Sequence, residues 1–502
     1  MKNKKKSMKQ KSNLLTVFLK ALTGFVFFMF TSSVMKGAEH DKPEKPNILF
    51  ILVDDLGKEW ISCYGAEKIE TPNIDRLAQT GMRFENAYSM PQCTPTRATL
   101  LTGQYPFRNG WTNHWDVPRW GSGCHFDPQR NASFARLLRN AGYATAIAGK
   151  WQIDDFRVEP MALYEAGFDA WSVWTGGEGG NIEKSSHRYW DPYIHEGTVH
   201  GTRSQTRDEF GPDIYTNFLI DFMIEHKDKP LLLYYPMCLT HGPLVTTPDE
   251  PDASGTEGKF KAMVRYMDKM VGRLMSALEE EGLRDETIII FTTDNGTMNR
   301  QTGIRDGREV RGAKAQRSEA GTAMPFIVSG PGLVPQGKVT LALTDFTDIL
   351  PTFAELAGSK PNQRWQVDGH SIAPLLLGKT TDSPREWICS QGGHPASFQN
   401  NRVVPADLFD DRVIRNKRWK LWVNTKRKPV KLYDLKNDPW EENNLIDSNH
   451  EDARAAKKEL MKVIKKMPKV DAAPGYDPNP AMPWDKGDYE GVLDASNRRF
   501  RY

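Results

Sequence analysis

The sequence predicts an α/β fold: a large, mostly parallel β-sheet flanked by helices, with a smaller α+β subdomain at the C-terminus. The chain has 502 residues, enough for one large domain and one smaller domain. Apolar runs of strand length alternate along it with helical patterns, which is typical of β–α–β units. These runs are continuously apolar, as expected for parallel strands that are buried on both faces.

The individual elements follow this alternation. Strands are expected at residues 48–53, 143–148, 231–235 and 287–293, and helices at 72–80, 132–139, 216–225 and 261–281. The pattern changes near residue 385. Residues 412–424 alternate like one exposed antiparallel strand, and residues 431–444 indicate a strand followed by a turn. We therefore expect a main domain over residues 46–385 and a C-terminal subdomain over residues 386–502.

The N-terminus has the composition of a secretory signal. Six lysines between positions 2 and 11 precede an apolar stretch at 14–30, which Lys20 interrupts, and small residues follow up to Ala38. We predict that residues 1–38 are a signal peptide, that the protein is exported to the periplasm or secreted, and that it meets the membrane only through this segment. The alternative is an uncleaved anchor, which needs about 20 apolar residues.

Charge and cysteine usage exclude several classes of protein. The formal net charge of +3 arises from residues 1–38, which hold eight lysines and no acid; without them it is −5. The remaining chain has no basic footprint, so we expect no nucleic-acid partner. The five cysteines, at positions 63, 93, 124, 238 and 389, include no C-x-x-C pair, which argues against a zinc-ribbon or thioredoxin-type site. The odd number leaves at least one thiol outside any internal disulfide.

Polar residues follow four of the predicted strands. The carboxyl ends of parallel strands meet at one edge of a sheet, where ligands bind, so we expect these residues to lie together. The alternative is a purely structural role, in which each residue belongs to a turn, a helix cap or the surface. The oxygen-only members of the set are suited to Ca²⁺ or Mg²⁺ rather than zinc. The set comprises Asp54, Asp55, Asp294 and Asn295, which offer only oxygen atoms, together with Lys150 and His241.

Residues 93–103 read CTPTRATLLTG. A cysteine just before a helix start can by itself be a low-pKa thiolate. The stretch also matches, in register, the C-x-P-x-R motif and LLTG segment of the type I (formylglycine-dependent) sulfatases of the alkaline phosphatase superfamily, which the chain resembles. In that family a maturation enzyme oxidises the motif cysteine to formylglycine, and the hydrate of formylglycine is the nucleophile.

The resemblance extends over nearly the whole chain after the signal. It includes GYAT through GKW at 142–151, the opening strand at 46–55, TDNG at 293–296, RGAK at 311–314 with 319–325, and LYDL at 432–435 with DP and NNL beyond it. It implies an alkaline phosphatase-like fold, a sulfatase catalytic domain over residues 46–385 and an enzyme that hydrolyses sulfuric esters.

The resemblance also implies roles for single residues. Asp54, Asp55, Asp294 and Asn295, with residue 93, would hold Ca²⁺, with Mg²⁺ as the alternative. Arg97 would stabilise the nucleophile formed from Cys93, Lys150 and Lys314 would bind sulfate oxygens, and His241 would bind substrate and protonate the leaving alcohol. The family usually continues its second signature as Lys-Trp-His, whereas Gln152 follows Lys150-Trp151 here. Gln152 can bind a sulfate oxygen but cannot act as a base.

The substrate is indicated by the composition of residues 171–193, which are rich in Trp, Tyr, Gly and charge and include Trp174, His187, Arg188, Tyr189 and Trp190. Aromatic rings beside Arg and His suit a sulfated saccharide, because sugars stack on rings and sulfate pairs with guanidinium. The alternative is a packed loop with aromatic anchors. His394 and Arg412 are weaker candidates. Two other functions stay open: a phosphodiester or phosphonate monoester hydrolase, and a non-catalytic sulfoglycan-binding protein.

Overall fold

A computed structural model describes residues 45–112, 125–175, 187–393, 397–399, 402–404 and 407–474. The predicted signal peptide, Cys124 and His394 lie outside these residues. Residues 45–474 contain a ten-stranded main sheet. Its strands, in spatial order, are β12 (Lys338–Asp345), β2 (Gly81–Tyr88), β11 (Phe326–Ser329), β8 (Thr287–Thr293), β1 (Asn47–Val53), β7 (Leu231–Pro236), β3 (Ala144–Lys150), β4 (Ala170–Trp174), β5 (Tyr193–Thr198) and β6 (Gly201–Thr206).

The centre of this sheet is parallel and its flanks are mixed. Strands β8, β1, β7, β3 and β4 run parallel to their neighbours within this group. Strand β11 is antiparallel to both β2 and β8, while β5 and β6 continue the other flank as an antiparallel ribbon. The prediction of a large, mostly parallel sheet is therefore confirmed, and the four predicted strands form its centre.

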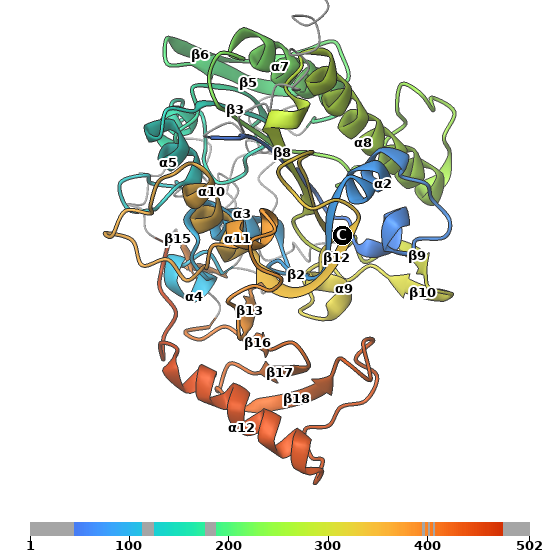
Figure 1. Ribbon diagram of the computed structural model, residues 1–502, viewed down its shortest axis with the longest axis vertical. Helices are drawn as coiled ribbons and strands as arrows, with labels where there is room; N and C mark the ends of the chain where they lie inside the picture. The colour runs from blue at the N-terminus through green and yellow to red at the C-terminus, as the bar shows by residue number, and fades with distance from the viewer. Residues whose placement is uncertain are drawn as a thin grey trace, which may run out of the picture. The chain divides into compact units, whose positions relative to one another are not determined.

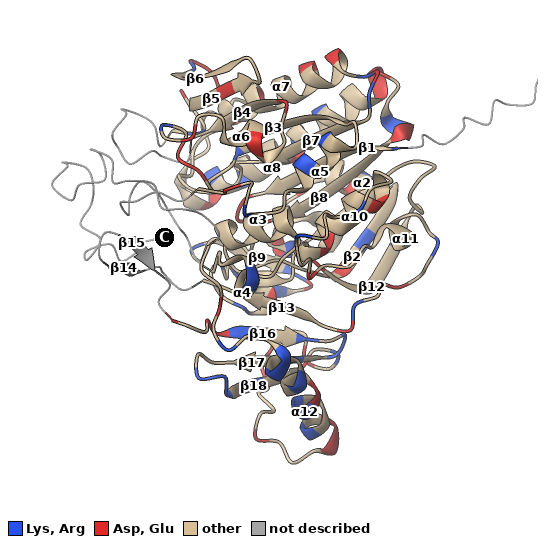
Figure 2. Ribbon diagram, turned by 90° about the vertical axis from the view of Figure 1, so that its left-hand side faces the viewer, with Lys and Arg blue, Asp and Glu red and all other residues tan. Residues whose placement is uncertain are grey.

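Helices cover both faces of the sheet (Figure 1). Phe50 of β1 packs on one face against Phe134 of α5 (Phe134–Asn140) and Phe353 of α10 (Ile349–Leu356), with ring centroids 6.2 and 5.6 Å away. Leu49 and Ile51 point to the other face, where α7 (Gly211–Glu225) and α8 (Gly255–Glu280) lie. Because β1 is buried on both faces, all its positions are apolar except Asn47, and the central strands carry almost no charge in Figure 2.

The predicted helices are present, but two begin earlier than expected. Helix α7 begins at Gly211 rather than 216, with Pro212 in its first turn, and α8 begins at Gly255 rather than 261. Proline is well suited to a first helical turn, where no amide hydrogen is required. The first turn of α8 is polar and exposed, so the apolar periodicity that marks a helix starts only at Phe260.

The C-terminal subdomain is a four-stranded antiparallel sheet covered by one helix, α12 (Glu451–Lys466). The prediction of one exposed strand at 412–424 is wrong, because the segment forms two strands joined at Asn416, and both are largely buried. One face packs on α12 through Ile414 and Leu421, while the opposite face carries Lys420, which is buried in an ion pair with Glu319 at 2.9 Å. The strands are β13 (Ile388–Gln391), β16 (Arg412–Arg415), β17 (Trp419–Val423) and β18 (Pro429–Asp434).

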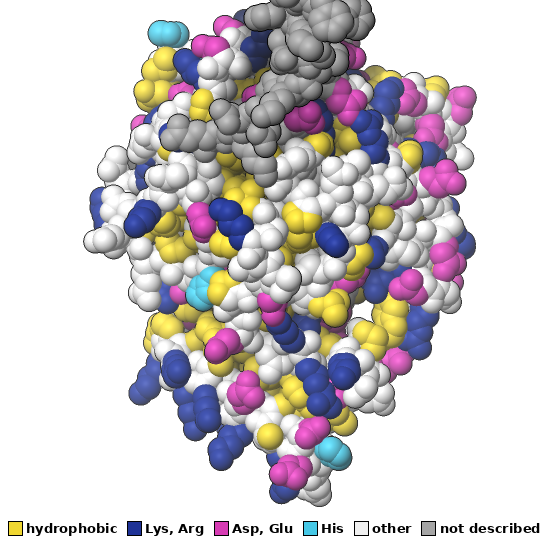
Figure 3. Space-filling view, viewed as in Figure 1, with side chains coloured by type: hydrophobic (Ala, Val, Ile, Leu, Met, Phe, Trp, Pro, Cys, Tyr) yellow, Lys and Arg dark blue, Asp and Glu magenta, His cyan; other side chains and the backbone are white. Residues whose placement is uncertain are grey.

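Basic and acidic side chains are interspersed over the face of the molecule in Figure 3.

Within the described part of the chain, no helix combines the length and the apolar character needed to cross a membrane. The four cysteines of that part, Cys63, Cys93, Cys238 and Cys389, are all free thiols.

Candidate active site

The structure brings the predicted strand-end residues together at one edge of the main sheet. Asp54 and Asp55 follow β1, Asp294 follows β8, and Lys150 is the last residue of β3. The backbone joins these ends directly, since the amide of Asp294 donates to the carbonyl of Val53 at 2.9 Å. The juxtaposition inferred from parallel strands is thus what the fold contains.

Each carboxylate of the first strand has its own lysine. Lys150 Nζ donates to Asp54 Oδ2 at 2.7 Å, and Lys314 Nζ donates to Asp55 Oδ2 at 2.8 Å. Asn295 Nδ2 donates to the other Asp55 oxygen at 2.7 Å. Asp55 has a φ of 61°, a left-handed conformation that Asp tolerates better than most residues. That conformation lies at the sharp turn where the chain leaves β1.

Arg97 ties the third carboxylate to the helix that carries the C-x-P-x-R motif. Its Nη2 donates to Asp294 Oδ2 at 2.8 Å, and its Nη1 donates to the carbonyl of Lys150 at 2.8 Å. Thr96 Oγ1 donates to the carbonyl of Asp294 at 2.8 Å. Sequence reasoning missed Thr96, because it lies at a variable position of the motif and carried no signal of its own.

Cys93 is the first residue of helix α3 (Cys93–Thr102) and is completely buried. Its Sγ and one oxygen each of Asp54 and Asp294 all lie within 4.8 Å of one another. The positive end of a helix favours negative charge at this position. Residue 93 therefore lies where a negatively charged nucleophile is stabilised both by the helix and by the neighbouring cations.

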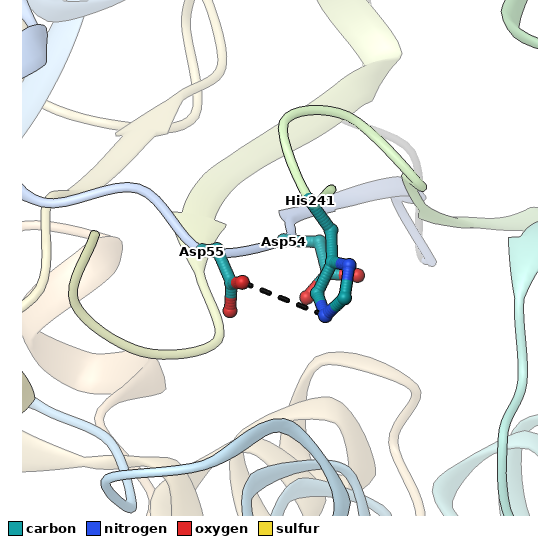
Figure 4. A group of neighbouring side chains, drawn as sticks. All are labelled: Asp54, Asp55 and His241. Atoms are coloured by element: carbon teal, nitrogen blue, oxygen red, sulfur yellow. Dashed lines mark ion pairs between the residues drawn. The ribbon is translucent and has the colours of Figure 1, made fainter. Parts of the chain in front are cut away.

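His241 reaches the same cluster from the loop after β7. Figure 4 shows its ring beside Asp54 and Asp55, with Nε2 3.6 Å from Asp55 Oδ2. Its Nδ1 lies 2.7 Å from the carbonyl of Gly242 and 3.3 Å from Nη1 of Arg188. Burial, and then the charge of Lys314, lower the pKa of His241 well below its usual value.

The carboxylates of this cluster repel one another, and the resulting pKa shifts differ between Asp54 and Asp294. Burial alone raises the pKa of Asp54, but Lys150, His241 and Arg97 together bring it far below its usual value. Burial, and then the charge of Asp54, raise the pKa of Asp294 well above its usual value despite the contact with Arg97. A bound cation would relieve this repulsion.

The donor atoms fit a hard divalent cation. Asp54 Oδ1 and Asn295 Oδ1 are buried and have no hydrogen-bond partner among the described residues. Buried polar atoms without a partner are rare and call for an explanation such as an ion. The carboxylate and amide groups offer only oxygen, the donor that Ca²⁺ and Mg²⁺ prefer. Asp54, Asp55, Asp294 and Asn295 therefore fit the predicted cation.

Gln152 and the described residues of 171–193 lie in different environments. Gln152 has a φ of 71°, and its buried Oε1 has no hydrogen-bond donor in the described part of the chain. Trp174 and Tyr189 are buried, as the packed-loop alternative requires, whereas Trp190 is 42% exposed. Arg412, a weaker candidate, is fully buried in the C-terminal sheet.

Comparisons with known proteins agree with this site. A family model described as "Sulfatase" matches residues 46–359, and one described as "N-sulphoglucosamine sulphohydrolase, C-terminal" matches residues 314–469. Human arylsulfatase A is 30% identical over 491 residues, which cover 86% of this chain and 90% of that protein. N-acetylgalactosamine-6-O-sulfatase of Bacteroides thetaiotaomicron is 31% identical over 490 residues, covering 84% of this chain and 93% of that protein.

Solved structures share the fold of this chain. The crystal structure of Ps i-CgsB superposes with a TM-score of 0.70 at 25% identity, covering 87% of this chain and 95% of that chain. The phosphonate monoester hydrolase of Agrobacterium radiobacter shares the fold, with a TM-score of 0.59, at 20% identity and over 84% of this chain and 95% of that chain.

Proposed function

We propose a mechanism and a substrate class for this chain, which belongs to the sulfatase family and hydrolyses sulfate esters. The proposal is an exported enzyme that removes sulfate from sulfated carbohydrates with a formylglycine made from Cys93 and a bound Ca²⁺. The observation that carries it is the position of Cys93 at the start of α3, within 4.8 Å of two carboxylates in a cluster that leaves buried oxygens unpaired.

Two groups would supply the central chemistry. One is formylglycine, made from Cys93, and the other is the divalent cation that the neighbouring oxygen atoms fit. Formylglycine at position 93, as its hydrate, supplies an oxygen nucleophile together with a second hydroxyl that allows sulfate to be expelled. Ca²⁺ held by Asp54, Asp55, Asp294 and Asn295 supplies positive charge where negative charge develops.

The cationic side chains bind and orient the sulfate. Lys150 and Lys314 bring their ammonium groups to the sheet edge, one beside Asp54 and one beside Asp55. Arg97 is buried, has a raised pKa because Asp294 and Asp54 outweigh the effect of burial, and stays charged throughout. Such preorganised cations stabilise the charge that builds up on the sulfate oxygens in the transition state.

His241 moves protons at the leaving oxygen. Its Nε2 faces the cluster at Asp55, on the side opposite the backbone contact of Nδ1 with Gly242. A histidine in this position can protonate the leaving alcohol, and then, in its neutral form, accept a proton in the step that releases sulfate. That second role falls to His241 because Gln152 cannot take a proton.

Three observations support a carbohydrate substrate and export. Two relatives are named for saccharide substrates, the N-acetylgalactosamine-6-O-sulfatase at 31% identity and the N-acetylgalactosamine-6-sulfatase of Canis lupus familiaris at 30%. The Ps i-CgsB protein has also been solved in complex with k-i-k-neocarrahexaose, at 25% identity to this chain. Residues 1–38 have the composition of a signal peptide. The phosphonate hydrolase shares only the fold at 20% identity, so it remains the weaker alternative.

The test begins with the full chain produced together with a formylglycine-generating enzyme. Peptide mass spectrometry should show loss of sulfur from the Cys93 peptide, and the matured protein should release sulfate from sulfated saccharides faster than it hydrolyses phosphonate monoesters. Cys93→Ala should abolish turnover, whereas Cys63→Ala, at a cysteine outside the cluster, should retain it. An active Cys93→Ala protein, or a preference for phosphonates, would overturn the proposal.

A further inference from the structure

We propose that Arg188 is a specificity-determining residue that binds a second anionic group, a sulfate or a carboxylate, on the sugar that carries the scissile sulfate ester. The inference rests on the proposed function and deepens it by narrowing the substrate class. It assigns a role to a residue outside the nucleophile, the cation ligands and the two sulfate-binding lysines.

Arg188 lies beside the residue that handles the leaving group. Its Nη1 is 3.3 Å from Nδ1 of His241, whose other ring nitrogen faces Asp55. Its guanidinium lies 3.8 Å from the ring centroid of Trp174, at the end of β4. The stacking fixes the plane of the guanidinium and leaves its edge to meet a ligand.

The charge of Arg188 is not neutralised by the described part of the chain. No carboxylate there forms an ion pair with it, and its buried Nε has no hydrogen-bond partner in the same residues. Among these residues its guanidinium contacts the imidazole of His241 and the aromatic ring of Trp174. The buried Arg97, Arg385 and Arg412 differ in this respect, because each of them pairs with a carboxylate. A partly buried cation without an anion is costly, and an anionic ligand offsets that cost.

The segment that carries Arg188 is held in place by its neighbours. The hydroxyl of buried Tyr189 donates to the carbonyls of Cys238 and His241, at 2.7 and 2.5 Å. The indole of Trp190 donates to the carbonyl of Thr246 at 3.0 Å. The amide of Gly211 donates to the carbonyl of Tyr189 at 2.7 Å. Arg188 and His241 are therefore positioned by one network, which fixes the guanidinium relative to the leaving oxygen.

This placement determines where the second anion lies on the substrate. Nε2 of His241 faces the cluster, and Arg188 lies at Nδ1 of the same imidazole. We therefore place the second anion on a sugar position next to the one that carries the scissile sulfate. A guanidinium binds both sulfate and carboxylate through paired N–H donors. The preferred substrate is thus a disulfated sugar or a sulfated uronic acid, rather than a sugar with a single negative charge.

The experiment compares matched substrates. The matured full-length enzyme is assayed on a monosulfated sugar, on the same sugar with a second sulfate at a neighbouring position, and on the corresponding sulfated uronic acid. We expect kcat/KM to be about 10- to 100-fold higher for the preferred doubly charged substrate, the size of a charge-assisted hydrogen bond. Arg188→Ala should bring this ratio close to one, Arg188→Lys should retain part of it, and Arg203→Ala, at a site 69% exposed, should leave it unchanged.

The ratio of kcat/KM between doubly and singly charged substrates separates this role from an effect through His241, because both substrates need the same proton transfer. An equal loss on singly and doubly charged substrates in Arg188→Ala would overturn the proposal. Calorimetric binding of the doubly charged sugars to the full-length Cys93→Ala protein, with and without Arg188→Ala, gives a readout that does not need turnover. Weaker binding by about 10- to 100-fold on loss of Arg188 supports the proposal, and equal binding overturns it. Absence of any sulfate hydrolysis by the matured enzyme would contradict the proposed function instead.

Discussion

Two clusters of buried carboxylates in the described part of the chain differ in how their oxygens are paired. The edge cluster, Asp54, Asp55 and Asp294 with Asn295, lies at the carboxyl end of the central strands. The Arg385 cluster lies where β12 ends, before α10, and contains Asp345 and Asp348 with Arg385. All of these side chains are at most 5% exposed.

In the Arg385 cluster every carboxylate oxygen has a donor. Arg385 donates to both acids, with Nε 2.8 Å from Asp348 Oδ2 and Nη2 3.1 Å from Asp345 Oδ1. The hydroxyl of Tyr105 donates to Asp345 Oδ2 at 2.5 Å, and the amide of His370 donates to Asp348 Oδ1 at 2.7 Å. We call this cluster closed, because its contacts join Arg385 to the turn between β12 and α10 and leave no carboxylate oxygen without a donor.

The edge cluster, by contrast, is open, because two of its oxygens have no hydrogen-bond donor. Asp54 Oδ1 and Asn295 Oδ1 have no donor within the described residues, although both are buried. Burial of acids therefore does not distinguish a binding site from a structural ion pair, whereas unpaired oxygens do. The difference predicts that equivalent substitutions will have opposite effects on activity and stability in the two clusters.

The largest expected effect is on activity. Asp294→Asn removes charge from the edge cluster and should lower kcat/KM by about 10³-fold or more, because charge stabilisation by a metal is worth several kcal/mol. The same change in the closed cluster, Asp348→Asn, should cost about 3–5 kcal/mol of unfolding free energy, since it breaks a buried pair. Activity per folded molecule should survive in Asp348→Asn. Steady-state kinetics with denaturant titrations check both values, and equal activity losses would remove the distinction.

The second prediction ranks residues within the active site. His241→Ala should lose about 10²–10⁴ in kcat/KM on sulfated sugars, the usual contribution of general acid–base catalysis. Gln152→Ala should lose less, because an amide cannot move a proton. An aryl sulfate has a good leaving group, so His241→Ala should show a burst of phenol followed by slow turnover. A silent His241→Ala with a damaging Gln152→Ala would reverse these roles.

The third prediction concerns metal removal. Chelation should lower activity and melting temperature together, and Ca²⁺ or Mg²⁺ should restore both, because the ion binds only the folded state; at 100 times Kd the gain is about 2.7 kcal/mol. The Ca²⁺-dependent shift should persist in Asp348→Asn and shrink in Asp294→Asn, as differential scanning calorimetry can show. Restoration by zinc alone would contradict the oxygen-only donor set.

The sequence was sufficient to predict the edge cluster but not the Arg385 cluster. Asp54 and Asp294 could be predicted because each directly follows a continuously apolar strand, and parallel topology brings such ends together. Arg385 lies 37 residues beyond Asp348 in the chain, with no motif that relates them, so only the fold reveals their contact. The contact between Arg188 and His241 was equally hidden, because it depends on how Tyr189 anchors one loop to another.

Buried polar faces also misled the prediction at the C-terminus. The alternation of 412–424 resembles an exposed strand because charged residues recur along it, among them Arg412 and Lys420. Both are buried, and each is paired with an acid from elsewhere in the chain, Arg412 with Asp471 and Lys420 with Glu319 at 2.9 Å. A periodic pattern records which residues are charged, but it does not record whether a partner covers them.

The last expected effect is a dependence of stability on pH that belongs to the Arg385 cluster. Burial, and then the charge of Asp348, raise the pKa of Asp345 to about 6 from 3.8, against the opposing charge of Arg385. The folded state thus holds this proton more tightly than the unfolded state, so the stability it contributes is present below about pH 4 and is lost as pH rises through 6, a change of up to about 3 kcal/mol. The Asp345→Asn variant serves as the reference, because its side-chain amide does not titrate. Urea titrations at saturating Ca²⁺ should therefore show the wild type losing stability relative to Asp345→Asn between pH 4 and 7. Parallel curves would mean that the single guanidinium of Arg385 neutralises both acids, and that the closed cluster, unlike the edge cluster, stores no unfavourable charge.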